Sequence, residues 1–200
     1  MAKVHPNAFY FYSSNSLMNT DRETYTIWMK SLIYNSNGCT IFNSKGDIVY
    51  RIDNYTRKCS SEVYLMDIRG QVLFTLRRKK LSLFRCWEGY RSSNLDTRKE
   101  TPMFRVRENC RILKRDLLCQ VNVGCDRSTA TCYSIEGLFG KSDFQILDHQ
   151  RRIIAEAKQK VSASGVLLGE DVSSLVVESG SDHSFIIALI AVYGLINHKM

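Results

Sequence analysis

The side chains of this sequence best suited to binding a ligand are basic, and they gather in two clusters. The first, LRRKKL (76–81), follows an alternating apolar segment, and the second is FRVRENCRILKR (104–115). Because Phe104 and Val106 alternate with Arg105 and Arg107, we expect both arginines on one face of a strand. Guanidinium groups on one face bind phosphate through paired hydrogen bonds, although a solvated outer face has the same composition. The candidate phosphate-binding residues are Arg77, Arg78, Lys79, Lys80, Arg105, Arg107, Arg111, Lys114 and Arg115.

Residues that carry out covalent or metal chemistry do not form a known motif here. The chain has no GxSxG, Walker-type phosphate loop, GxGxxG or HExxH. We therefore expect no enzyme, no catalytic residue, no metal and no cofactor, while a Cys–His nucleophile pair stays open as an alternative. The histidines lie near the chain ends, in a turn and at the start of an apolar segment, and the later cysteines are spaced too unevenly for zinc. These residues are His5, His198, His149 and His183, and Cys110, Cys119, Cys125 and Cys132.

One phrase recurs three times, as FNSKGDIVYRID (42–53), MDIRGQVLFTLR (66–77) and LDHQRRIIAEAK (147–158). Its Asn or Asp side chain bonds to nearby backbone N–H groups, and a glycine three residues later supplies the positive φ of a hairpin turn. The third copy has Arg151 in place of the glycine, so we expect its turn to differ or to be strained. An acid–base role for Asp67 or Asp148 is the alternative interpretation. Alternation predicts that nine residues face the core: Ile48, Tyr50, Ile52, Val72, Phe74, Leu76, Ile153, Ala155 and Ala157.

The rest of the chain predicts a mainly β domain that ends in one helix. Short segments rich in β-branched and aromatic residues begin at Tyr25 and are separated by turn residues, which is typical of a sandwich or barrel. FIIALIAVYGLI (185–196) is shorter than the roughly 20 apolar residues of a membrane span. It predicts a helix buried on all sides, with Ser181 or Asp182 as its cap. We expect an N-terminal arm at 1–24 and a single domain at 25–200, with its helix at about 182–197.

Composition indicates anionic partners and a reducing compartment. The formal charge of the 200 residues is +8, which favours phosphoinositide headgroups, RNA or acidic proteins, although solubility alone also explains such a charge. The seven cysteines include no CxxC pair, and the N-terminus lacks a signal-peptide run. We therefore expect a monomer in the cytoplasm, with the nucleus as an alternative.

Four segments of the chain strongly resemble the plant LURP-one-related family. They are YTIWMKSLIYNSNGCTIFNSKGDIVYRIDNY (25–55), EVYLMDIRGQVLFTLRRKKLSLFRCWEGY (62–90), YSIEG (133–137) and VLLGEDVSSLVVESGSDHSFIIALI (166–190). The family is similar in fold to the tubby C-terminal domain and to phospholipid scramblases. The resemblance therefore implies a closed antiparallel barrel of about twelve strands around a central apolar C-terminal helix.

The same resemblance implies a non-enzymatic binding or adaptor domain. The founding member of the family is linked to plant defence, and related barrels bind phosphoinositides through basic residues. We therefore expect anionic phospholipid headgroups or acidic proteins as partners, with nucleic acid as a secondary expectation, no transmembrane span and a cytoplasmic or peripheral-membrane location. The alternatives are a tubby-like nuclear regulator of transcription and a scramblase-like membrane protein.

Overall fold

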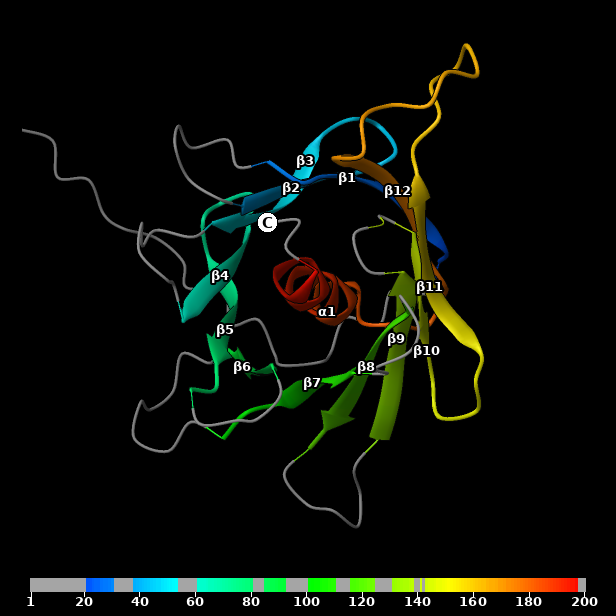
Figure 1. Ribbon diagram of the computed structural model, residues 1–200. Helices are drawn as coiled ribbons and strands as arrows, with labels where there is room; N and C mark the ends of the chain where they lie inside the picture. Colours follow the sequence, from blue (N-terminus) through cyan, green and yellow to red (C-terminus); the bar gives the residue numbers. More distant parts are fainter. Residues whose placement is uncertain are drawn as a thin grey trace, which may run out of the picture.

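The computed structural model describes residues 21–30, 38–53, 61–80, 85–92, 101–110, 116–124, 131–138, 141 and 143–197. In this part of the chain, twelve antiparallel strands form a closed barrel around one helix (Figure 1), which confirms the predicted fold class. The expected arm at 1–24 lies mostly outside the described residues. The strands are β1 (Glu23–Trp28), β2 (Gly38–Phe42), β3 (Ile48–Asp53), β4 (Glu62–Asp67), β5 (Val72–Arg78), β6 (Cys86–Arg91), β7 (Phe104–Cys110), β8 (Asp116–Val123), β9 (Thr131–Leu138), β10 (Phe144–Leu147), β11 (Ile153–Gln159) and β12 (Val172–Val177), and the helix is α1 (His183–Ile196).

The barrel is an up-and-down meander in which each strand pairs with the next, and β12 pairs with β1 to close it. Closure leaves every strand with two neighbours, so the sheet has no unpaired edge. Successive connections alternate between the two ends of the barrel. We call the end of the barrel at His183 the N-mouth and the end at Ile196 the C-mouth. The connections that follow β2, β4 and β10 lie at the N-mouth. The connection that follows β11 lies at the C-mouth.

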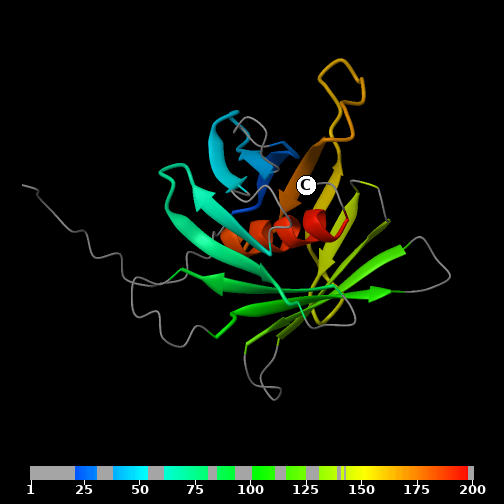
Figure 2. The same cartoon turned by 60° about the vertical axis from the view of Figure 1, so that its left-hand side comes forward.

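Helix α1 fills the barrel, because its sequence is apolar on all sides. Twelve of its 14 residues are buried, and Figure 2 shows it lying along the interior. Asp182 caps the helix: its Oδ1 accepts a hydrogen bond of 3.2 Å from the backbone N–H of Phe185, as the sequence predicted. At the other end, the side-chain amide of Asn197 donates to the carbonyl of Lys141 at 2.9 Å. Both ends are therefore tied to polar groups, and the apolar body is enclosed.

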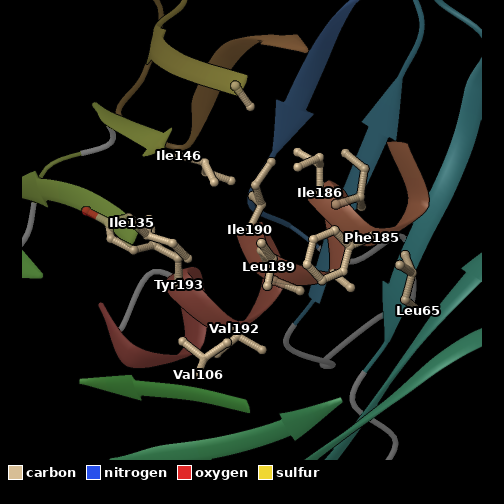
Figure 3. Packing of buried hydrophobic residues seen from close by; sticks show 14 of the residues in the cluster. Leu65, Val106, Ile135, Ile146, Phe185, Ile186, Leu189, Ile190, Val192 and Tyr193 are labelled. Carbon is tan, nitrogen blue, oxygen red and sulfur yellow. The ribbon is translucent and has the colours of Figure 1, made fainter. Parts of the chain in front are cut away.

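Inward-facing side chains of the strands complete the core around α1. Figure 3 shows Leu65, Val106, Ile135 and Ile146 of the barrel surrounding the side chains of the helix. Each of these four is fully buried, and burying an aliphatic side chain of this size contributes roughly 1.5–3 kcal/mol. The helix and the barrel therefore share one apolar core.

The repeated phrase forms the same hairpin turn in all three copies. In the second copy, Oδ1 of Asp67 accepts hydrogen bonds from the backbone N–H groups of Arg69 at 2.9 Å and Gln71 at 2.8 Å. Asn43 and Asp148 accept the equivalent pairs in the other copies. All three turns lie at the N-mouth. The repeat is thus a building block of the barrel, as the turn interpretation predicted.

Arg151 takes the place of the glycine in the third turn without changing its hydrogen bonds. Its φ is 64°, compared with 88° for Gly46 and 80° for Gly70. Of the two expected outcomes, a different turn or a strained one, the structure has the strained one, because a side chain in the left-handed region costs conformational energy. The Arg151 side chain forms an ion pair with Glu136 on β9, which holds it on the outer face.

A fourth turn of the same kind lies between β11 and β12, where the sequence did not predict one. The hydroxyl of Ser162 accepts from the N–H of Val166 at 3.1 Å, and Gly165 has a φ of 81°. Serine replaces the Asn or Asp of the other turns and bonds more weakly in the same role. This turn lies at the C-mouth, opposite the other three.

The inward pattern was predicted correctly except next to the turns. Phe74, Leu76, Ile52, Ala155 and Ala157 are buried and Tyr50 is half-buried, whereas Ile153 is 45% exposed. Each hairpin shifts register there, and the shift adds one residue to the strand that follows the turn. The extra residue breaks the alternation. Val49, Leu73 and Ile154 therefore pack against the core in place of the predicted Ile48, Val72 and Ile153.

Replacing Asp67 with alanine removes the acceptor of two backbone N–H groups. We expect Asp67→Ala to lower the free energy of unfolding by about 1–2 kcal/mol. Asp67→Asn keeps the Oδ1 acceptor and should cost less than half as much. Urea denaturation measures both values, and equal losses in the two variants would show that the turn depends on charge and not on the acceptor.

Gly89 of β6 gives space to the ring of Phe104. A Cβ added at Gly89 would lie 2.1 Å from Cζ of that ring. We therefore expect Gly89→Ala to destabilise the protein by about 1–3 kcal/mol through overpacking. In a Phe104→Leu background the same change should cost much less, and a double-mutant cycle measures the difference. If the losses of stability from Gly89→Ala and Phe104→Leu were additive, they would contradict the contact between these two residues.

Candidate functional site

The structure brings Arg77 and Arg105 to one outer face of the barrel, on either side of Glu88. In the register of the sheet, Arg77 of β5 lies opposite Glu88 of β6, which in turn lies opposite Arg105 of β7. Their neighbours Leu76 and Val106 are fully buried. Alternation along each strand therefore fixes the outward direction of the arginines.

Together with Glu62 these side chains form a row of alternating charge, which we call the charge ladder (Glu62, Arg77, Glu88 and Arg105). Nε of Arg77 lies 3.4 Å from the Glu62 carboxylate, and Nε of Arg105 lies 2.9 Å from that of Glu88. The guanidinium of Arg77 also covers the ring of Tyr90 at 4.8 Å, a cation–π contact. The arginines are therefore held in place by neighbouring strands.

Two tyrosine hydroxyls position the carboxylates of the ladder. Tyr64 donates to Glu62 and Tyr90 donates to Glu88, each at 3.0 Å. Burial and these hydrogen bonds raise the pKa of both tyrosines, so the hydroxyls remain donors at neutral pH. Only 15% of the Glu88 side chain is exposed, and Glu88 is also 3.9 Å from the ammonium of Lys79. Glu88 is thus the carboxylate shared by the cations around it.

The remaining predicted cations extend the positive surface towards the C-mouth. Arg78, Lys79 and Lys80 are exposed and continue from the end of β5, and Arg107 is the next outward residue after Arg105. The predicted candidates Arg111, Lys114 and Arg115 lie outside the described residues. We call the six described cations the basic strip: Arg77, Arg78, Lys79, Lys80, Arg105 and Arg107. The carboxylates of Glu62 and Glu88 pair with three of these cations: Arg77, Lys79 and Arg105.

A hollow of about 610 Å³ lies at the N-mouth, between the β10–β11 turn and the start of α1. Its lining includes the apolar side chains of Tyr133, Ile154 and Phe185 and the charged side chains of Asp148 and Arg152. Sequence reasoning did not find it, because its lining residues are spread from Met103 to Ile186 and meet only in the folded barrel. The ion pair of 2.7 Å between Arg152 and Asp148 occupies its rim.

His183, at the start of α1, is buried. Nδ1 of His183 lies 2.7 Å from the hydroxyl of Tyr25, which also bonds to Glu23. Burial and the contact with Glu23 raise the pKa of Tyr25 strongly. The group links the first residue of the helix to β1, which is a structural role.

The described cysteines do not resemble activated nucleophiles. Cys39, Cys86 and Cys119 are buried, and Cys132 is exposed. Burial raises the pKa of Cys119 to about 12 and raises that of Cys39 further, so neither forms a thiolate readily. Within the described residues, no three His, Cys, Asp or Glu side chains are close enough to hold a metal ion.

Known proteins are similar in sequence to this chain over almost its full length. The model of the LURP-one-related family matches residues 23–194. The chain belongs to this family. Two relatives from Arabidopsis thaliana, LURP-one-related proteins 11 and 4, are 44% and 43% identical to it; each alignment covers 98% of this chain, and 89% and 87% of the relatives. An X-ray structure of an Arabidopsis thaliana protein has the same fold, with a TM-score of 0.63 and 16% identity over 90% of this chain and 94% of that one.

The family assignment confirms the resemblance to the LURP-one-related family that the sequence showed. In the part of the chain that the structure describes, we find no helix with the length and apolar character that crossing a bilayer requires.

Acid should destabilise the protein partly through Asp148. Burial raises the pKa of this carboxyl, but hydrogen bonds from Arg152 and Gln150 outweigh burial, and the net pKa is lowered. A lowered folded-state pKa stabilises the protein above the unfolded value of about 3.9, and this stabilisation is lost as the pH falls through the folded-state pKa.

We therefore expect Asp148→Asn to have a smaller loss of stability between pH 5 and pH 3 than the wild type. Urea midpoints at both values measure this. Equal losses of stability between pH 5 and pH 3 in the two proteins would contradict the claim that hydrogen bonds lower the pKa of Asp148.

Proposed function

We propose that this protein is a non-enzymatic binding module whose basic strip contacts the phosphates of phosphoinositide headgroups. The observation that carries the proposal is that Arg77, Lys79 and Arg105 lie around the carboxylates of Glu62 and Glu88 on this side of the barrel. The other three cations of the strip are exposed towards the C-mouth. The inward face of these strands is occupied by core side chains. A ligand that binds strands β4–β7 therefore contacts their outer surface.

The geometry favours phosphate over a monovalent anion. Arg77 and Arg105 point outward from two strands that flank β6. Arg77 is held by its contacts with Glu62 and the ring of Tyr90, and Arg105 is held by its ion pair with Glu88. A guanidinium held in this way keeps further N–H donors for a second acceptor, because it has five. A headgroup with several phosphates can bridge the two arginines, whereas a small anion reaches one.

Glu88 sets the strength of the proposed interaction. Its carboxylate already accepts from Arg105 and Tyr90, so a phosphate competes with an internal anion for the same donors. Such an arrangement gives weak, salt-dependent binding to isolated headgroups, because exposed charges are screened. Several headgroups on a membrane surface act together, which favours peripheral attachment in the cytoplasm. Family membership supports a role connected with plant defence as part of this proposal.

Removing two cations of the basic strip tests the proposal. We expect Arg78→Ala/Lys79→Ala to weaken binding to vesicles of phosphatidylcholine with phosphatidylinositol 4,5-bisphosphate by on the order of tenfold or more, since each cation near an anionic surface contributes about 1 kcal/mol. The matched control, Lys45→Ala/Arg69→Ala, removes one lysine and one arginine at the N-mouth and should bind like the wild type. Co-sedimentation measures all three proteins. Equal losses in both variants would indicate a general charge effect and would reject the strip as the site.

Removing the internal competitor should have the opposite effect. We expect Glu88→Gln to strengthen binding to the same vesicles several-fold, because Arg105 and Lys79 lose their shared carboxylate. The stability cost should be on the order of 1–2 kcal/mol, because Glu88 is largely buried and hydrogen-bonded, and Gln keeps an acceptor oxygen. Weaker binding by a folded Glu88→Gln protein would mean that Glu88 positions the cations instead of competing for them.

A further inference from the structure

The connection between β11 and β12 carries an apolar tip. Val161, Val166 and Leu167 of this hairpin are 49%, 61% and 61% exposed. In Figures 1 and 2 the hairpin, drawn in orange, stands out from the barrel. Leu138, at the C-mouth end of β9, is also exposed, so most of the exposed large apolar side chains of the described residues lie at this end. Such a cluster has an energetic cost in water and marks a contact surface.

The backbone of the tip is closed by its own hydrogen bonds. The N–H of Ser162 donates to Val166 at 2.8 Å, that of Gly165 donates to Ser162 at 3.0 Å, and Val161 and Leu167 form a bridge. The N–H groups of Ser162, Gly165 and Val166 are therefore satisfied within the turn. Each N–H group satisfied within the turn lowers the cost of moving this segment into an apolar medium, compared with an open loop.

Polar and charged groups begin at the base of the hairpin. Lys158 pairs with Glu156 at 2.8 Å, and Lys30 pairs with Asp171 at 3.0 Å, while Lys160 reaches the hydroxyl of Thr26. The base is thus nearly neutral and strongly polar. It suits the headgroup level of a bilayer, where lysine stems lie against apolar groups and their ammonium groups stay hydrated.

The hairpin lies at the same end of the barrel as the part of the basic strip that follows β5, which is Arg78, Lys79 and Lys80. The strip runs off β5 at the C-mouth, and the strand order places β5 almost opposite the β11–β12 pair on the barrel wall. Two separate contacts at one end define a plane on which the barrel can rest. We infer that the hairpin inserts Val161, Val166 and Leu167 into the interface of an anionic bilayer, while the basic strip binds headgroups on the opposite side of the C-mouth.

This inference rests on the proposed function, because the attraction to an anionic surface comes from the basic strip. A bilayer is favoured over a second copy of the chain by the shape of the tip. Stable protein interfaces bury about 1,200–2,000 Å² in total, which three side chains on a narrow projection do not provide. A bilayer needs no complementary surface, so a small convex tip is sufficient there.

The test uses the full chain with vesicles of phosphatidylcholine, with and without phosphatidylinositol 4,5-bisphosphate. Val166→Trp reports insertion through quenching by lipids brominated on their acyl chains, and the wild type corrects for Trp28 and Trp87. Val166→Ser/Leu167→Ser removes the apolar tip; both positions are exposed, so its thermal midpoint should match the wild type. Ile68→Ser is the matched control, because Ile68 is 66% exposed at the N-mouth.

We expect Val166→Trp to be quenched on anionic vesicles and the double serine variant to bind on the order of tenfold more weakly, while Ile68→Ser binds like the wild type. Wild-type binding with no quenching and an unaffected double serine variant would overturn the inference and leave the proposed function intact. A third outcome is that quenching and binding are the same with and without the phosphoinositide, and the same in the Arg78→Ala/Lys79→Ala variant as in the wild type. That outcome would reject the proposed function and keep insertion. A wild-type dimer that the serine variant converts to a monomer would overturn insertion in favour of self-association.

Discussion

The enclosure of α1 by the barrel is the constraint on which the rest of this structure depends. A helix that is apolar on every side needs apolar contacts in every direction, and a closed sheet provides them. Closure in turn requires twelve strands in a continuous register, from the β1–β12 pairing around to β2. The helix cap at Asp182 and the link from His183 to Tyr25 fix where the helix begins within the barrel. Sheet and helix therefore stabilise each other and form one cooperative unit.

The filled interior moves recognition to the outside. In lipid-carrying barrels the lumen holds the ligand, but here the described inward side chains pack on α1. Outward positions are free of that packing constraint and carry the alternating row of Glu62, Arg77, Glu88 and Arg105. The two ends of the barrel also differ. The three Asn or Asp turns lie at the N-mouth, whereas the apolar hairpin and the part of the basic strip that follows β5 lie at the C-mouth, which gives the molecule a polarity along the helix axis.

Much of this fold was readable from the sequence because its signals are local. The Asn or Asp of each turn, the alternation after it and the apolar final segment each report one element, and family resemblance supplied their order. The inward positions of Ile48, Val72 and Ile153 were predicted wrongly, because a bulge depends on the partner strand. Arg151 was expected to change its turn or to strain it; the hydrogen bonds of the hairpin keep the turn unchanged, and Arg151 takes a strained φ of 64°.

The candidate site was only partly predictable for the same reason. Outward projection of Arg105 and Arg107 follows from alternation, whereas the position of Glu88 between Arg77 and Arg105 depends on register across three strands. The fourth turn at Ser162 was missed because serine is a weaker signal than aspartate, and with it the exposure of Val166 and Leu167. The hollow near Asp148 and Phe185 likewise requires the closed barrel.

Hydrogen exchange of the full chain, with and without vesicles containing phosphatidylinositol 4,5-bisphosphate, tests the central claim that this barrel meets membranes through its C-mouth. We predict slower exchange on vesicles in the segment that follows Arg77 and in the hairpin around Val166, with no change in the turns at Asn43, Asp67 and Asp148. Protection of those three turns, or an unchanged C-mouth on vesicles that bind the protein, would contradict this account.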